Sequence, residues 1–138
     1  MPTLEPLLIQ PFSHMQLRVA RHTNDLKIII AFYTELVGLQ NLGSFSDHDG
    51  YNGVFLGYEN KDWHLEFTES SEPPSHSSDE DDLLVFYTDS DEEFNKSIAR
   101  FEEKGLKAIP AKNPYWNLHG KQFLDPDGFA IIITKKRS

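Results

Sequence analysis

The sequence predicts an α+β fold made of two copies of one module, in which a strand is followed by a helix and then by three more strands. Two observations lead to this prediction. Stretches with alternating apolar and polar residues, as in half-buried strands, precede stretches with apolar residues at helical spacing, and this order occurs once in each half of the 138 residues. The two predicted helices end at Gly38 and Gly105, which lie 67 residues apart, so an internal duplication is the simplest interpretation.

The first module begins with a predicted strand over His14–Val19, where polar and apolar residues alternate. A helix follows, because four apolar residues from Ile29 to Leu36 stand at positions i, i+3, i+4 and i+7. Capping residues precede it near Asp25, and Gly38 ends it. Turn-forming residues separate three further predicted strands: Gln40–Phe45, Gly53–Gly57 and Trp63–Thr68.

The second module repeats this order. A predicted strand over Leu83–Thr88 precedes a helix in which Ser90 and Glu93 have the spacing of a capping box, and Gly105 ends that helix. Three strands are again predicted: Leu106–Pro110, Lys121–Leu124 and Phe129–Thr134. The last two are joined by the predicted turn Asp125–Gly128.

Acidic residues are concentrated between the two modules. The chain has 22 acidic and 13 basic residues and a net charge of -9, yet ten of the acidic residues lie between Glu69 and Glu93, where there is no Lys or Arg. Residues 70–82 carry no large apolar side chain, so we predict a solvated linker in which His76 is exposed. The chain is then a single domain, with module one at about 13–69 and module two at about 83–135.

Composition argues against several classes of function. A negative chain without a basic patch repels phosphate backbones and anionic lipids, so we expect neither nucleic acid nor a membrane as a partner. No stretch approaches the roughly 20 apolar residues of a spanning helix, and no signal peptide is recognisable, so a cytoplasmic location is expected. Because the chain has no cysteine, any metal must be held by histidine and carboxylate side chains.

Several stretches of the chain together resemble a known superfamily. They are HMQLRV at residues 14–19, IIIAFYTELVGL at residues 28–39, and NPYW at residues 113–116 before GKQFLDPDGFAIII at residues 120–133. In this order they resemble the vicinal oxygen chelate superfamily, which includes glyoxalase I, extradiol dioxygenases, fosfomycin resistance enzymes and bleomycin resistance proteins. The resemblance implies that two βαβββ modules form a cup-shaped, eight-stranded mixed sheet with helices on the outside. It further implies that the cup holds a small molecule, usually beside a divalent metal.

The same resemblance implies four metal-ligand positions, two in each module. In the first module they are His14 and Glu66, residue types that the superfamily uses as ligands. In the second module they are Leu83 and Ile132, whose side chains have no lone pair to donate. The usual four-ligand site is therefore incomplete, and any ion on His14 and Glu66 alone would be weakly held.

Two interpretations of the remaining polar residues stay open. His64 shares a strand face with Glu66, so His14, His64 and Glu66 form a two-histidine, one-carboxylate set that suits zinc or ferrous iron. Alternatively, Glu66 accepts hydrogen bonds from His14 and Arg18 in a polar network without a metal. We favour the network.

Alternation with period two also predicts the lining of the cup. The first module is expected to contribute Gln16, Arg18 and His64, and the second contributes an apolar wall: Leu83, Val85, Tyr87, Ala130 and Ile132. Such a pocket suits an amphipathic ligand whose anionic or hydrogen-bonding end lies near Arg18. Tyr115 and Trp116 lie on a loop that borders the cup in the superfamily, so the resemblance makes them candidate ligand contacts.

Two classes of function follow. The first is a small-molecule binding protein of the bleomycin-resistance type, with no cofactor. The second is a glyoxalase-like lyase or isomerase, or a dioxygenase, that uses zinc, nickel or iron on His14 and Glu66, with Glu66 as a catalytic base. We favour the first, because Leu83 and Ile132 remove half of the usual ligands. The resemblance also implies a homodimer. Separately, three prolines around Leu7–Ile9 indicate that residues 1–12 form an extended arm, which covers either an edge strand or a neighbouring subunit.

Overall fold

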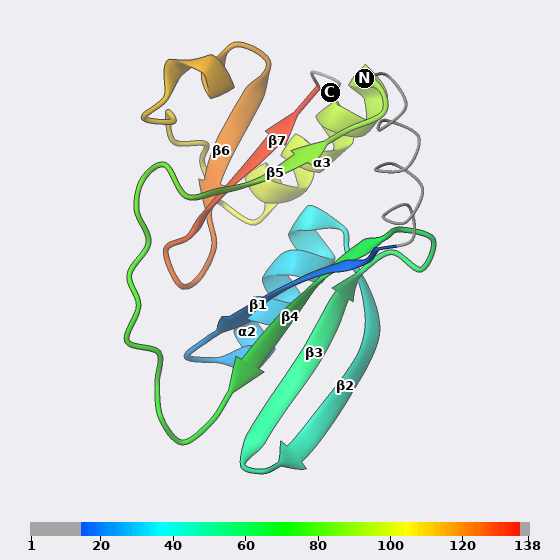
Figure 1. The fold of residues 1–138 in the computed structure, drawn as a ribbon. Helices are drawn as coiled ribbons and strands as arrows, with labels where there is room; N and C mark the ends of the chain where they lie inside the picture. The colour runs from blue at the N-terminus through cyan, green and yellow to red at the C-terminus, as the bar shows by residue number, and fades with distance from the viewer. Residues whose placement is uncertain (1–14, 136–138) are drawn as a thin grey trace, which may run out of the picture.

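The computed structural model describes residues 15–135 and contains two separate β-sheets. The first sheet has four strands in the order β1-β4-β3-β2, with β1 parallel to β4 and the other pairs antiparallel. Figure 1 shows this sheet on one side of a helix and the second sheet on the other. Its strands, in chain order, are β1 (Leu17–His22), β2 (Gln40–His48), β3 (Tyr51–Gly57) and β4 (Trp63–Glu69).

The first strand starts three residues later than alternation alone predicts. It runs from Leu17 to His22 instead of His14 to Val19, and Leu17 pairs with Trp63, the first residue of β4. The limits follow from the partner strand, because a ladder extends only as far as both strands do. His14 and the predicted arm at residues 1–12 lie outside the described residues.

The helix of the first module has two parts. The α-helix α2 (Leu26–Ala31) continues as the π-helix η2 (Phe32–Val37). The Asp25 carboxylate accepts the Ile28 amide, and Gly38 ends the helix in the left-handed conformation with φ 96°, both as the sequence predicts. The wider π turn is not visible in the apolar spacing, which fits a 3.6-residue helix equally well.

The second sheet has three strands in the order β5-β7-β6. They are β5 (Leu83–Tyr87), β6 (Gly120–Leu124) and β7 (Ala130–Thr134), with helix α3 (Asp91–Glu103) after β5 and the short 3-10 helix η3 (Pro114–Asn117) before β6. The Ser90 hydroxyl accepts the Glu93 amide at the start of α3, which confirms the predicted cap.

The predicted strand Leu106–Pro110 is wrong. This segment forms only an isolated bridge between Ile109 and Gln122, so the sheets within residues 15–135 hold seven strands in place of the expected eight. Proline lacks the amide that a ladder needs, and Pro110 directly follows the bridging residue, which prevents the pairing from extending through it.

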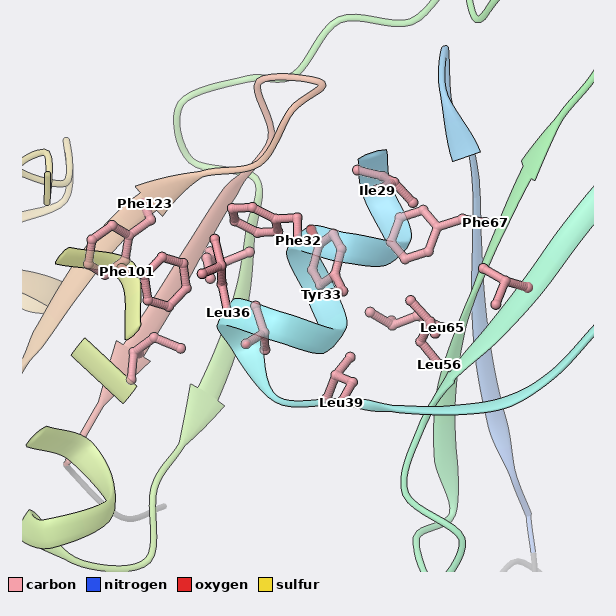
Figure 2. Close-up of a cluster of buried hydrophobic side chains, with 14 of the residues drawn as sticks. Ile29, Phe32, Tyr33, Leu36, Leu39, Leu56, Leu65, Phe67, Phe101 and Phe123 are labelled. Atoms are coloured by element: carbon pink, nitrogen blue, oxygen red, sulfur yellow. The ribbon is translucent and has the colours of Figure 1, made fainter. Parts of the chain in front are cut away.

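One hydrophobic core is shared by both modules. Figure 2 shows Ile29, Phe32, Tyr33 and Leu36 of α2 and η2 between Leu56, Leu65 and Phe67 of the first sheet and Phe101 and Phe123 of the second module. Tyr33 stacks on Phe67 at 4.9 Å between ring centroids, and Phe101 stacks on Phe123 at 4.0 Å. The helix is therefore apolar on two sides, and each sheet turns one face toward it.

Polar contacts also join the modules. Arg21 of β1 forms a buried ion pair with Asp125 of the β6–β7 turn, and Tyr33 donates to the same carboxylate at 2.7 Å. At the other end of the helix, the Arg100 guanidinium of α3 donates to the carbonyls of Leu36 at 3.0 Å and Val37 at 3.3 Å. These contacts satisfy carbonyl groups that a helix end leaves without an intrahelical partner.

The acidic linker runs along one side of the molecule between the two sheets (Figure 1) and is largely exposed, as predicted. His76 is exposed but makes two contacts that the sequence did not indicate. Its Nε2 lies 3.0 Å from the carbonyl oxygen of His22, and its ring meets Phe129 edge to face at 5.1 Å. The linker is therefore attached to both modules along its length.

Candidate functional site

Arg18, His64 and Glu66 lie together on the face of the first sheet that is turned away from the helix. Parallel pairing of β1 with β4 sets Arg18 opposite His64 and Ala20 opposite Glu66, so the three polar side chains project from one face. Arg18 Nε donates to His64 Nε2 at 2.8 Å, and Arg18 Nη1 lies 3.7 Å from Glu66 Oε1. The sequence predicted all three residues as members of one site.

This geometry fixes the role of each polar group. Arg18 Nε donates its hydrogen bond to His64 Nε2, so this ring nitrogen acts as an acceptor and its lone pair points at the guanidinium. The Glu66 side chain is only 15% exposed, whereas that of Arg18 is 51% exposed. The face therefore presents a cation to solvent with a largely buried carboxylate beside it.

The expected polar network is present in part. Its Arg18–Glu66 contact exists as an ion pair, while the contribution of His14 falls outside the described residues. Gln16 is exposed and directly precedes β1. Its predicted role as a ligand contact, like those of Arg18 and His64, stays a prediction.

The second module departs from the expected cup. Ile132 is completely buried and Ala130 is 5% exposed, so neither lines an open pocket. Gln122 pairs with Ile132 across the β6–β7 ladder and thus shares its face, and the Gln122 amide donates to the carbonyls of Ile109 and Pro110 at 3.4 Å. The segment that fails to form an eighth strand therefore lies beside this face of the sheet.

The predicted aromatic contacts lie apart from Arg18. Tyr115 and Trp116 belong to η3 and meet edge to face at 5.0 Å. Trp116 lines a hollow of about 410 Å³ together with Leu83, one of the two apolar residues at the expected ligand positions. Tyr87 borders a different and larger groove. Within one chain, Trp116 therefore lies apart from Arg18, whereas Tyr87 borders the same groove as His64.

The larger groove, of about 980 Å³, lies between β1, β5 and α3. Its walls include Leu17 and Val19 of β1, Phe86 and Tyr87 of β5, and Trp63 at the start of β4. In the part of the chain that the structure describes, β1 pairs only with β4 and β5 only with β7, so both strands that border the groove are edge strands. At one end Tyr58 donates to the carbonyl of Gly38 at 2.9 Å, and burial raises the pKa of Tyr58.

Among residues 15–135, no three histidine or acidic side chains gather closely enough to hold a metal ion. His64 and Glu66 do share a face, but the Arg18 guanidinium contacts both of them. The described donors therefore do not fit a divalent cation, because a positive group already occupies the position that the ion would need. No helix in this part of the chain is long and apolar enough to cross a membrane.

Sequence reasoning missed the aromatic residues on the same face. Phe45 of β2 and Phe55 of β3 lie with their ring centroids 5.9 Å apart, and Arg18 Cζ lies 4.7 Å from the Phe55 centroid. The alternation of β3 indicates that Phe55 and Glu66 face the same way once their pairing is known. That register was the missing information, because β3 is apolar on both faces.

The chain matches two related domain families, one in each half. Residues 17–68 match the YycE-like N-terminal domain family and residues 81–135 match the YycE-like C-terminal domain family. The uncharacterized protein YycE of Bacillus subtilis is 38% identical over 130 residues, which cover 91% of each chain.

Solved structures agree with this result. A crystal structure of a YycE protein of unknown function from Bacillus subtilis superimposes with a TM-score of 0.83 at 35% identity, covering 94% of this chain and 96% of that one. Leishmania major glyoxalase I gives 0.67 at 23% identity, with 86% and 84% covered. TnmS3, an antibiotic binding protein from a Streptomyces species, gives 0.62 at 24% identity, with 88% and 94% covered. These last two show a shared fold.

Proposed function

The chain belongs to the YycE-like family of the vicinal oxygen chelate superfamily, and from this we propose that it is a small-molecule binding protein of the glyoxalase/bleomycin-resistance type. The observation that carries the proposal is the convergence of Arg18, His64 and Glu66 on the open face of the first sheet. A few convergent polar groups beside apolar surface are typical of ligand sites. The antibiotic-binding protein TnmS3, which has the same fold, supports a binding role.

The ligand is held without a metal in this proposal. Arg18 supports this part, because its guanidinium already neutralises Glu66 and takes the lone pair of His64 Nε2. A divalent ion bound to His64 and Glu66 would have to displace the guanidinium of Arg18. The ion would then be repelled by the positive charge of Arg18 close by. Leu83 and the buried Ile132 add no donor from the second module.

The alternative is a metal-dependent glyoxalase-like lyase or isomerase, or a dioxygenase, on His14 and Glu66, with His64 as the third ligand. The observation in its favour is that His64 and Glu66 share one face, so two of three ligands are already neighbours. Elemental analysis of the purified protein separates the two proposals. We expect less than one tenth of a divalent ion per chain, whereas one tightly held zinc, nickel or iron would favour the alternative.

We further propose that the protein acts as a homodimer in which the partner completes the site. Two edge strands, β1 and β5, remain unpaired on one side among residues 15–135. Apolar side chains on both are exposed, including Leu17 at 61% and Tyr87 at 44%. In such a dimer, β1 of each copy would pair with β5 of the other copy. The four-stranded sheet of one copy would then continue into the three-stranded sheet of its partner, and a twofold axis would relate the two joined sheets.

A small-molecule screen tests the binding function. Compounds that raise the melting temperature are mapped by NMR on the labelled protein, and we expect the hits to shift the signals of Arg18, His64 and their neighbours. The variant Arg18→Gln should weaken a mapped hit by about tenfold, because a charge-assisted hydrogen bond is lost. Hits that shift only the groove residues Tyr58 and Trp63 would contradict the proposed location.

A further inference from the structure

An aromatic row crosses the open face of the first sheet next to the polar cluster. The ring centroids of Phe45 and Phe55 are 5.9 Å apart, and those of Phe55 and His64 are also 5.9 Å apart. All three side chains are partly buried although they lie on the face away from the core. The first module therefore supplies its own aromatic surface, in addition to the polar side chains that the sequence predicted for it.

Gly53 positions Phe45 within this row. A methyl group at Gly53 would lie 2.3 Å from two atoms of the Phe45 ring, so the ring rests directly on the glycine backbone. Glycine in the middle of a strand loses packing that a side chain would provide, and it is typically found where another group approaches the backbone closely. Here that group is an aromatic ring, one side of which lies against the sheet.

The charged groups beside the row have unused hydrogen-bonding capacity. Arg18 is held in place by His64 and by its stacking on Phe55 at 4.7 Å, yet within residues 15–135 its two terminal nitrogens donate no hydrogen bond. Glu66 likewise accepts no hydrogen bond from the described part of the chain, and its contact with Arg18 is 3.7 Å long. A largely buried carboxylate is stabilised by a donor close to it.

We infer that the ligand is a flat aromatic compound carrying an acidic group and, on the neighbouring ring carbon, a hydrogen-bond donor. This inference rests on the proposed binding function and specifies its ligand class. The acidic group pairs with the terminal nitrogens of Arg18, which donate no hydrogen bond within residues 15–135, and the adjacent donor bonds to Glu66. The ring system lies against Phe45, where stacked or edge-to-face contacts favour aromatic over saturated carbon.

Four related compounds test each part of this description by isothermal titration calorimetry. The probe is 3-amino-2-naphthoate, which has the acid, the adjacent donor and two fused rings. The comparison compounds are its methyl ester, which lacks the charge, 2-naphthoate, which lacks the donor, and decahydro-2-naphthoate, which is saturated. We expect the probe to bind at least tenfold more tightly than the ester and about fivefold more tightly than 2-naphthoate. We expect 2-naphthoate to bind about fivefold more tightly than its saturated counterpart.

Variants of the aromatic row provide the second arm. Phe45→Leu and Gly53→Ala, which displaces the Phe45 ring, should each weaken the probe about fivefold and leave the saturated compound unaffected. Glu66→Ala, which removes the acceptor oxygens, should abolish the preference for the amino compound over 2-naphthoate. The matched control is Ile28→Ala, which removes an exposed apolar side chain from α2, on the other side of the sheet. Circular dichroism establishes that every variant is folded.

The outcomes separate this inference from the proposed function. Equal binding of the ester or the saturated compound would overturn the ligand class, as would full affinity in Phe45→Leu. If none of the four compounds binds while other small molecules shift the signals of Arg18 and His64, the inference is wrong and the binding function stands. If no small molecule perturbs this face, the proposed function is wrong as well.

Discussion

The guanidinium of Arg21 forms a buried ion pair with the carboxylate of Asp125, 104 residues further along the chain. The Asp125 side chain is completely buried, and its second oxygen accepts the amides of Asp127 and Phe129 within its own turn. Arg21 also lies 3.9 Å from the centre of the Phe129 ring. One aspartate thus closes the β6–β7 turn and connects it to the first strand.

Replacing Asp125 with asparagine should therefore destabilise the protein strongly. The amide side chain keeps the turn contacts but leaves Arg21 without a charge partner, and breaking a buried ion pair from one side costs about 3–5 kcal/mol. Urea denaturation measures the loss. The control is Glu92→Gln, which breaks the exposed pair with Lys96 and should cost about 0.5 kcal/mol or less. A similar loss in both variants would show that burial of the Arg21 pair is unimportant.

The hydroxyl of Tyr33 predicts a stability effect at alkaline pH. Burial and, next, the negative Asp125 raise the pKa of Tyr33 above its ordinary value of 10.0. The folded protein then keeps a proton that the unfolded chain loses above pH 10, so the free energy of unfolding should fall as pH rises beyond 10. The slope should be up to about 1.4 kcal/mol per pH unit steeper in the wild type than in Tyr33→Phe. Parallel curves from denaturation between pH 9 and 11 would contradict this expectation.

Arg18→Ala should raise the affinity of His64 and Glu66 for a divalent ion. Removal of the guanidinium frees Nε2 of His64 and leaves Glu66 without its cation, so both become available to a divalent ion. We expect zinc affinity, measured by competition with a chelating dye, to rise about tenfold over the wild type. His64→Ala in the same background should remove the gain. Unchanged affinity in Arg18→Ala would mean that Arg18 is not what keeps an ion away.

The edge strand β1 predicts the oligomeric state. Val19 is 44% exposed and borders the groove beside β5, so Val19→Lys should place a charge where the partner's strand is proposed to pair, without disturbing the core. Light scattering after size exclusion should give a dimer for the wild type and a monomer for the variant. Leu118→Lys, at another exposed apolar position, should remain dimeric. A wild-type monomer would contradict the proposed assembly.

The sequence predicted which helices and strands form more accurately than it predicted the residues at which the strands begin and end. Asp25, Gly38 and Ser90 mark helix ends by local chemistry, and the structure confirms each of them. The extent of β1 and the loss of a strand at Leu106–Pro110 depend on pairing between distant segments, which local patterns do not encode. The π-helical turn was likewise not predicted, because the apolar spacing fits a regular helix equally well.

The candidate site was predicted in part for the same reason. Period-two alternation placed Arg18, His64 and Glu66 on one face, and the parallel β1–β4 register brings them together. Alternation did not reveal that Ile132 is completely buried, because alternation shows which face of the sheet a residue lies on and not what covers that face. Nor did it find Phe45, whose position depends on a bulged pairing of β2 with β3.

The contact between Arg21 and Asp125 also bears on the order of folding. Its two residues are joined only after the turn near the end of the chain is in place, and the core helix likewise needs Phe101 and Phe123 to cover its second side. During synthesis, Arg21 and the second apolar side of the core helix would both stay exposed to solvent until the second module has been made. We therefore expect the two modules, although they share one pattern, to fold as one cooperative unit, and a fragment ending in the linker to be unstable and prone to aggregate.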